Sequence, residues 1–230
     1  MNYEERQSDY YEKNPTWHEE DSPWKAQQVL RMIKKNNLPV EKICEVGCGA
    51  GEILNQLHKQ LTTTEFEGYE VSPDAFTIAK PKEKERLSFY LQDFIAAGKD
   101  GYDILLAIDL IEHLEAKFTF LRNFKYKGTY KIFHFPLDLS AQSVLRNSPL
   151  NHKREKVGHV HYYTKDLALV TLRETGYEIL DWYYTGSSID LTSASLPSKV
   201  AKIPRKLLFK LFPDFTVRLL GGYSLLVLAR

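Results

Sequence analysis

Three glycines fall within five positions of the segment EVGCGAGEIL, residues 45–54. An apolar run, KICEVG at 42–47, leads into them, and EILNQLHKQL at 52–61 follows with apolar residues at helical spacing. The pattern predicts a strand, a tight turn and a helix. Glycine lets backbone come close to another group, and the end of a strand in an open sheet is where ligands bind, so we expect a ligand over this turn.

The alternation of strand and helix patterns continues along the chain. Strands that alternate with helices imply right-handed crossovers, which predicts an α/β fold: a Rossmann-like, doubly wound, seven-stranded and mostly parallel sheet with helices on both faces. We expect strands at 42–47, 65–71, 86–91, 102–108, 128–135, 177–184 and 222–230, and helices at 22–38, 52–61, 73–80, 111–124 and 164–176, with Ser22 capping the first helix.

The length of 230 residues and a hydrophobic fraction of 43% fit one globular domain over 1–230. We expect an N-terminal helical cap at 1–38 and two insertions, at 137–163 and 187–221, of the kind that form lids or binding loops. The two cysteines, Cys44 and Cys48, cannot build a disulfide framework or a four-ligand zinc site. Without a secretory signal or a long apolar run, the chain is expected to be cytoplasmic.

Two nucleotide-binding classes that use glycine turns do not fit the segment. A dinucleotide-binding turn needs G-x-G-x-x-G, but the third glycine here, Gly51, is one place early and Glu52 occupies the required position. A carboxylate there would repel a pyrophosphate. A P-loop is excluded because no Gly-Lys-Ser/Thr follows.

The segment from Glu45 to Gly51 resembles the first motif of the class I S-adenosylmethionine-dependent methyltransferases, E/D-x-G-x-G-x-G. Within that family the chain is most similar to the ubiquinone-biosynthesis-like small-molecule methyltransferases. The resemblance covers residues 40–185 and the final strand. It implies a methyltransferase whose cofactor, S-adenosylmethionine, lies over the glycine turn.

The resemblance also implies roles for residues after the next strands. Glu70 would accept the ribose hydroxyls, Asp93 the adenine amino group, with Phe94 packing near the base, and the segment AIDLIEHLE at 107–115 would meet the amino end of the cofactor. Trp24 is a candidate lid aromatic beside Tyr10 and Tyr11, with core packing as the competing interpretation. The expected cofactor-binding residues are Glu45, Gly47, Cys48, Gly49, Gly51, Glu70, Val71, Asp93, Phe94, Asp109, His113 and Trp24.

Asp109, Glu112 and His113 stand at i, i+3 and i+4, on one face of the expected helix. Carboxylates and an imidazole could hold a divalent cation, and the same segment in the quinone-biosynthesis O-methyltransferases resembles such a site. The competing interpretation is that Glu112 and His113 orient the helix and the cofactor. We expect no metal.

Methyl transfer to a hydroxyl requires a base, and histidine suits that task at neutral pH. The candidate catalytic residues are His134, His159 and His161. We expect a small-molecule or a lipid- or sugar-linked acceptor, with O-methylation preferred. Nucleic acid is not expected, since no basic and aromatic groove is evident. The alternative is a non-catalytic S-adenosylmethionine-binding protein of the same fold.

The segment 198–218 combines cations with apolar residues at near-helical spacing, and Pro204 and Pro213 divide it into short pieces. Basic amphipathic helices of this kind bind anionic membrane surfaces or pack on the domain or on a second subunit. We therefore expect either a packing surface or a peripheral membrane contact through 198–218. The sequence does not indicate the oligomeric state.

Overall fold

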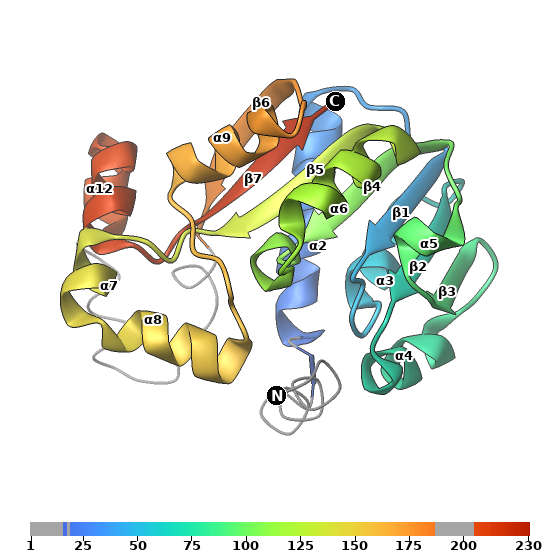
Figure 1. Cartoon of the computed structure of the whole chain (residues 1–230). Coiled ribbons are helices and arrows are strands. Elements are labelled where there is room, and N and C mark those ends of the chain that lie inside the picture. Colours follow the sequence, from blue (N-terminus) through green and yellow to red (C-terminus); the bar gives the residue numbers. More distant parts are fainter. Residues whose placement is uncertain (1–15, 18, 187–204) are drawn as a thin grey trace.

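A computed structural model describes residues 16–17, 19–186 and 205–230. Figure 1 shows one mixed sheet with helices on both sides. The strands are β1 (Lys42–Val46), β2 (Glu65–Glu70), β3 (Leu87–Leu91), β4 (Tyr102–Ile108), β5 (Gly128–Pro136), β6 (Ile179–Thr185) and β7 (Ser224–Ala229). The α-helices are α2 (Ser22–Lys35), α3 (Glu52–His58), α4 (Pro73–Ala79), α5 (Phe94–Ala97), α6 (Lys117–Phe124), α7 (Ala141–Arg146), α8 (Ser148–His152), α9 (Lys165–Glu174), 205–211 and α12 (Pro213–Leu220).

Shorter helical turns complete the description. They are η1 (Glu19–Asp21), η2 (Lys80–Lys82), η3 (Ile111–His113), η4 (Lys125–Lys127) and the π-helical turn η5 (Lys153–Val157). No helix in the described part of the chain is long and apolar enough to cross a membrane.

The sheet order is β3-β2-β1-β4-β5-β7-β6. The first five strands in this order are parallel, whereas β7 runs antiparallel to both β5 and β6. The chain leaves β1 toward one edge and returns to β4 on the other side, so the strand order reverses between β1 and β4. The carboxyl ends of these two strands are therefore where an open sheet of this kind binds a ligand.

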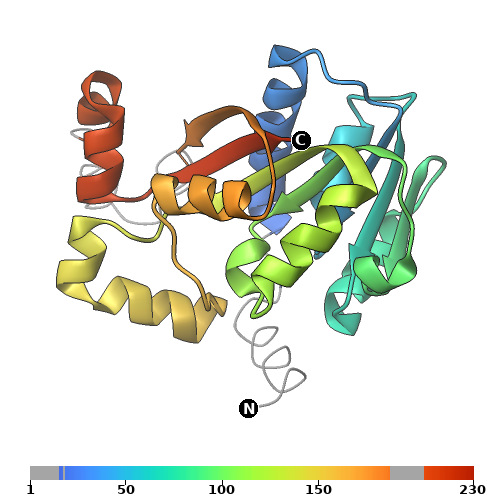
Figure 2. The same ribbon diagram turned by 45° about the horizontal axis from the view of Figure 1, so that its top comes forward.

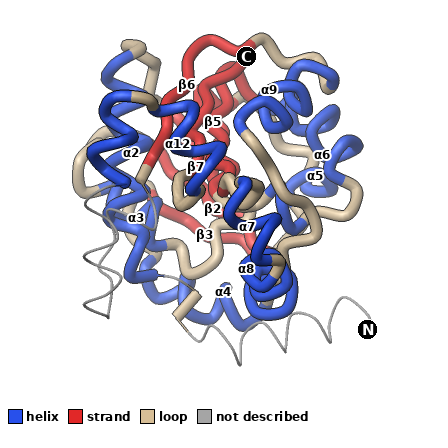
Figure 3. The backbone as a smooth tube through the Cα atoms, turned by 90° about the vertical axis from the view of Figure 1, so that its left-hand side faces the viewer, coloured by secondary structure: helices blue, strands red, loops and turns tan. Residues whose placement is uncertain are grey.

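Two apolar layers hold the helices on the sheet. Helices α2 and α3 cover one face, while α5, α6 and α9 cover the other, as Figures 2 and 3 show from two directions. Buried side chains of α2 and α3 pack with Ile43, Ile104 and Ile132, and those of α6 and α9 pack with Cys44 and Phe133. Neighbouring residues of one strand thus point into opposite layers, as the alternation of a strand requires.

The predicted fold class and all seven strands are confirmed, with β7 as the antiparallel strand. The single helix expected at 111–124 is wrong, because only the short turn η3 forms before Leu114 becomes extended and α6 begins at Lys117. The carbonyl of Glu112 accepts hydrogen bonds from the N–H groups of Val160 and His161, so it is not available to a continuing helix. The cap at Ser22 is also wrong, since Asp21 holds the N-cap position without a side-chain bond.

The expected insertions contain short helices. Helices α7 and α8 and the turn η5 occupy most of 137–163, and residues 205–211 and α12 occupy the end of 187–221. Pro213 begins α12, as the sequence predicted. Pro204 and the earlier part of 198–218 lie outside the described residues, as do Tyr10 and Tyr11.

Candidate active site

The glycine turn joins β1 to α3, and its three glycines have φ angles of +68°, +53° and +73°. A Cβ at Gly47 would lie 2.7 Å from Cδ1 of Leu110, and one at Gly51 would lie 2.5 Å from the ring of Phe89. Among the described residues, a Cβ at Gly49 would meet only the ring of Trp17, at 4.0 Å. The bare backbone at 47 and 51 thus serves internal packing, and Gly49 is the glycine that leaves room for a ligand.

Glu70 ends β2 directly beside this turn. Its Oε2 accepts the N–H of Gly49 at 2.9 Å, and its Oε1 accepts those of Val71 and Ser72 at 2.8 Å. Burial raises the pKa of Glu70, while these three backbone donors act against the rise. The carboxylate is therefore fixed in place before any ligand arrives, and it keeps some acceptor capacity beyond these three bonds.

Apolar side chains flank Glu70 on the surface. Val71 is 43% exposed and Leu91, the register partner of Glu70 on β3, is 46% exposed. Asp93 is exposed and caps α5, its Oδ1 accepting the N–H groups of Ile95 and Ala96 at 2.7 and 3.0 Å. Acceptors bordered by exposed apolar side chains fit an adenosine, which has both a flat ring and hydroxyl donors.

Phe94 does not line this surface. Its ring is buried, with edge contacts to Tyr69 at 5.1 Å and Phe124 at 5.9 Å between ring centroids. Cys48 is likewise buried in the turn, and both cysteines are free thiols. Both residues are buried, and the cofactor contacts predicted for them stay predictions.

Asp109 lies at the end of β4 with a φ of +51°. Its Oδ2 is 2.9 Å from Nζ of Lys25 on α2, and its Oδ1 is 2.6 Å from Nδ1 of His134 on β5. Burial opposes ionisation of Asp109, but His134 and Lys25 outweigh it and hold its pKa well below the ordinary value. The ion pair between Lys25 and Asp109 thus connects the N-terminal helix to the end of β4.

His134 is held at both ring nitrogens. Nε2 lies 2.8 Å from the hydroxyl of Thr185, opposite the contact of Nδ1 with Asp109, and only 2% of the residue is exposed. The ring of Trp24 makes an edge contact with it at 6.2 Å. The catalytic role predicted for His134 stays a prediction, and its contacts are those of a residue that positions Asp109.

Glu45, the acid of the glycine motif, is also buried at the end of β1. Its Oε2 has no hydrogen-bond partner among the described residues. Burial raises the pKa of Glu45 to about 8, although the charge of Lys25 opposes the rise. For a hydrogen-bond donor of a ligand bound over the turn, this oxygen of Glu45 would be an acceptor.

A second group of side chains gathers where η3 meets the loop after η5. A carboxylate oxygen of Glu112 and one ring nitrogen from each of His113 and His159 lie within 4.8 Å of one another. Neither carboxylate oxygen of Glu112, which is fully buried, has a hydrogen-bond partner in the described chain. Burial and the carboxylates of Asp109 and Asp138 raise its pKa well above the ordinary value. Such a donor set suits a divalent cation.

Both imidazoles of this group are oriented through Nδ1. In His159, Nδ1 lies 2.6 Å from Oδ2 of Asp138, and in His113 it lies 3.2 Å from the carbonyl of Gly158. Carboxylates and carbonyls only accept, so in the neutral rings Nδ1 carries the proton and Nε2 the lone pair. Burial and the neighbouring His159 lower the pKa of His113 to about 4. This is the arrangement typical of metal-binding histidines.

The third predicted histidine lies apart from this group. Nε2 of His161 is 3.0 Å from the carbonyl of Leu114, and burial lowers the pKa of the ring. Its predicted catalytic role is not tested by this geometry. The site therefore has two parts: the glycine turn with Glu70 and Asp93, and the loop after β4 with Glu112 and its two histidines.

Sequence reasoning missed residues that reach the site from distant elements. Lys25 was an unremarked cation of a surface helix, Trp17 precedes the first predicted helix, and Thr185 ends a strand in the last third of the chain. Asp138, which follows β5 by two residues, carried the one usable signal: an acid just beyond the carboxyl end of a parallel strand.

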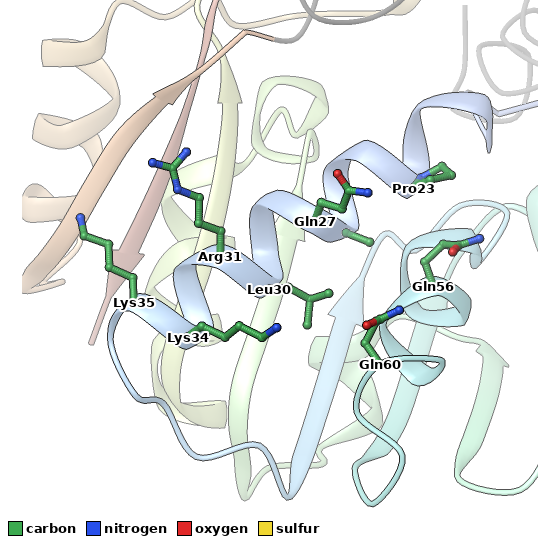
Figure 4. A pocket seen from close by; sticks show the side chains of 9 residues that line it. Pro23, Gln27, Leu30, Arg31, Lys34, Lys35, Gln56 and Gln60 are labelled. Atoms are coloured by element: carbon green, nitrogen blue, oxygen red, sulfur yellow. The ribbon is translucent and has the colours of Figure 1, made fainter.

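One surface groove lies apart from the site. It is a groove between α2 and α3, lined by Gln27, Leu30 and Gln56 with Arg31 and Lys35 at one end (Figure 4). The cations are already engaged, because Arg31 lies over the ring of Tyr183 and Lys35 pairs with Asp181. We assign the groove no function.

Comparisons with known proteins agree with this geometry. A family model described as "Methyltransferase domain" matches residues 17–181. No curated protein matches the sequence. Many solved structures share the fold at low identity.

Three of these structures illustrate the likeness. The N-methyltransferase NodS from Bradyrhizobium japonicum, solved with S-adenosyl-L-homocysteine, has a TM-score of 0.56 at 15% identity over 90% of this chain and 85% of its own. A SAM-dependent methyltransferase from Archaeoglobus fulgidus has a TM-score of 0.56 at 15% identity, over 89% and 93%. The methyltransferase domain of bacterial CtHen1-C has a TM-score of 0.58 at 19% identity, over 90% and 96%.

The family match spans most of the chain and includes the glycine turn, Glu70 and the segment after β4. The chain therefore belongs to the methyltransferase domain family, the class I S-adenosylmethionine-dependent methyltransferases.

Proposed function

We propose that this methyltransferase transfers the methyl group of S-adenosylmethionine to a hydroxyl oxygen of a small molecule, free or linked to a lipid or sugar. The observation that carries the proposal is the buried carboxylate of Glu112, which has no hydrogen-bond donor among the described residues and faces two imidazoles after the end of β4. A divalent cation at these ligands would bind the acceptor oxygen and lower the pKa of its hydroxyl. An amine acceptor has less need of such a group.

The cofactor half of the proposal assigns residues to each part of S-adenosylmethionine. Glu70 accepts the ribose hydroxyls, Asp93 faces the adenine with Val71 and Leu91 as apolar walls, and the open backbone at Gly49 underlies the methionine part. The cofactor supplies a methyl group on a sulfonium. The protein supplies position, since the reaction is an in-line displacement.

The acceptor half revises the metal-free expectation drawn from the sequence. The sequence offered Asp109, Glu112 and His113 as the set that could hold a cation, but Asp109 is engaged by Lys25 and His134. His159 takes its place beside Glu112 and His113. We therefore propose Glu112, His113 and His159 as ligands, with Asp138 orienting His159.

In this proposal His134 is a positioning residue. It holds Asp109 at one nitrogen and Thr185 at the other, and Asp109 in turn fixes the loop that leads to Glu112. Replacing Thr185 with Val would leave Nε2 of His134 without a partner. We expect the substitution to lower turnover while S-adenosylmethionine affinity stays within about twofold. If His134 were itself the catalytic base, loss of the Thr185 contact would remove a restraint on it and turnover would not fall.

The test of the metal is direct binding. Dialysed protein is titrated with Mn²⁺ and the free ion is followed by electron paramagnetic resonance. We expect one site in the wild type, loss of at least tenfold in affinity in Glu112→Gln and His159→Gln, and no change in the exposed control Glu115→Gln.

Turnover is the second measurement. A methyl-donor screen over hydroxyl-bearing metabolites is run with and without a chelator. We expect the chelator to abolish methyl transfer and added Mg²⁺ to restore it. Mn²⁺ binding that is absent, or equal in Glu112→Gln and wild type, would contradict the metal half of the proposal. Transfer to amines alone would contradict the oxygen acceptor, and S-adenosylmethionine binding without transfer would favour the non-catalytic alternative.

A further inference from the structure

One end of the molecule carries an unusual share of exposed apolar side chains. Fifteen large apolar side chains are exposed in the described part of the chain, and seven of them lie on α7 and on residues 205–220, which include α12. Leu207 and Leu211 are each 63% exposed. The full set is Val144, Leu145, Leu207, Leu211, Phe212, Phe215 and Leu219. We call these elements, together with α8 and η5, the terminal lobe.

The elements of the terminal lobe are neighbours in space. Gln142 of α7 accepts a hydrogen bond from Arg205 at 3.2 Å, and the Oγ of Ser140, the cap of α7, lies within 2.8 Å of where a Cβ on Gly221 would be. Figure 3 views this end of the molecule directly, with α12, α7 and α8 toward the viewer. Inward residues such as Val217 are buried, so the exposed apolar side chains form the outer surface of a folded layer.

The lobe is also strongly basic. Residues 141–157 and 205–220 contain eight lysines and arginines and two acids, a net charge of +6 in a chain whose net charge is +1. One of the two acids, Asp214, is already paired with Lys165 at 2.8 Å. The basic residues are Arg146, Lys153, Arg154, Lys156, Arg205, Lys206, Lys210 and Arg218.

Apolar side chains among cations match the chemistry of an anionic bilayer. Aliphatic side chains enter the acyl boundary, and each nearby cation is attracted by the negative surface potential. A nucleic acid would share the attraction to cations, but five of the seven exposed side chains are valine or leucine, which offer no stacking platform for bases, and only Phe212 and Phe215 are aromatic. The charge and the exposed side chains thus favour a lipid surface.

We propose that the terminal lobe docks the enzyme on an anionic membrane surface. The inference deepens the proposed function and rests on it in one respect: it makes the acceptor a lipid-linked hydroxyl in that membrane. The lobe begins beside the site, since Asp138, which orients His159, precedes the cap of α7 by two residues and its carbonyl accepts from Ser143 at 2.6 Å. A substrate drawn from the bilayer would therefore enter next to the ligands proposed at η3.

Co-sedimentation with vesicles tests the docking without any turnover. The full chain is mixed with vesicles of phosphatidylcholine alone or of phosphatidylcholine with phosphatidylglycerol. We expect pelleting with the anionic vesicles only. The double variant Leu207→Ser/Leu211→Ser should bind at least tenfold more weakly because it removes two inserting side chains. The double variant Lys206→Glu/Lys210→Glu should also bind at least tenfold more weakly, and its remaining binding should no longer depend on salt concentration.

A matched control removes comparable features from another part of the surface. Tyr126→Ser deletes an 81% exposed aromatic and Arg122→Glu reverses an exposed charge near the start of β5, and neither should change pelleting. Binding is compared only for variants whose melting temperature equals that of the wild type.

Four results would overturn the proposal. They are equal recovery in the supernatant with both lipids, equal pelleting of the lobe variants and wild type, binding to an RNA oligonucleotide as tight as to vesicles, or a dimer in solution that Leu207→Ser/Leu211→Ser abolishes. Because the assay reads only binding, its failure would leave O-methylation and Mn²⁺ binding untouched. Likewise, the absence of O-methylation or of Mn²⁺ binding would leave the expected pelleting unchanged.

Discussion

Lys131 carries its amino group into the interior of the sheet. Nζ donates to the carbonyl of Gly128 at 2.6 Å and lies over the ring of Tyr177, and the residue is 2% exposed. Burial, with the charge of Lys125, lowers its pKa to about 8. No part of the site uses this lysine, so its charge is a cost to the fold and not a catalytic device.

Replacing Lys131 with Met should therefore stabilise the protein, by about 1–2 kcal/mol at pH 7 after the lost hydrogen bond is deducted. The folded pKa lies below the unfolded one, so the unfavourable contribution is complete below pH 8 and is relieved as the pH rises through the interval from about 8 to about 10.5. Urea unfolding at several pH values measures it, with exposed Lys59→Met as control. A variant no more stable than wild type at pH 7 would contradict the estimate.

Glu70 is a second residue whose contacts predict a measurable effect. Its carboxylate is preset by three backbone donors and should accept both ribose hydroxyls, each charge-assisted bond contributing about 1.5–3 kcal/mol. Glu70→Gln should lower S-adenosylmethionine affinity at least tenfold by calorimetry, while Glu65→Gln at the exposed start of the same strand should not. Equal affinities would remove Glu70 from the ribose site.

The turn after β1 shows what a motif can and cannot reveal. Its strand, its glycines and its helix were all predicted from spacing, because local conformation imposes that spacing. The packing reason for Gly47 and Gly51 was not predicted, since it depends on Leu110 in the loop after β4 and on Phe89 of β3. Similarly, the break between η3 and α6 depends on bonds from residues 160–161 to Glu112, which no local pattern records.

Two substitutions in this turn should separate folding from binding. Gly51→Ala would place a Cβ 2.5 Å from Phe89 at a φ of +73°, so we expect a loss of at least about 2 kcal/mol in unfolding free energy. Gly49→Ala meets open space, so its stability should fall only by the backbone strain, about 1 kcal/mol, while S-adenosylmethionine binding is lost. The opposite pattern, with Gly49→Ala binding normally, would show that the cofactor lies elsewhere.

At the level of the fold, sequence reasoning succeeded where periodicity carries the information. Seven strands and the sheet class follow from alternation and crossover handedness. The two halves of the site differ in this respect. The proposed cofactor half consists of strand ends that follow one another in the chain, so chain order alone was enough to predict it. The acceptor half joins Glu112 to His159 and Asp138 across β5 and two short helices, and only the folded chain shows that contact.

This division predicts how the molecule responds to its cofactor. S-adenosylhomocysteine at about 100 times its dissociation constant should stabilise the fold by about 2.7 kcal/mol. The contacts proposed for it lie at the carboxyl ends of β1 to β4, so amide hydrogen exchange should slow at 46–52, 70–72, 91–95 and 108–113. The terminal lobe should stay unchanged.

Adding Mn²⁺ to that complex should then slow exchange at 112–113 and 158–161, where the proposed ligands and the bonds to Glu112 lie. Mass spectrometry of peptic fragments resolves these segments, and Glu70→Gln at the same ligand concentration serves as the control, because weak binding should leave its exchange close to that of the free protein. Two outcomes would contradict a site made of two halves that meet at the end of β4. One is cofactor binding that slows exchange equally in α7 and α12. The other is Mn²⁺ that slows exchange elsewhere but leaves it unchanged at 158–161.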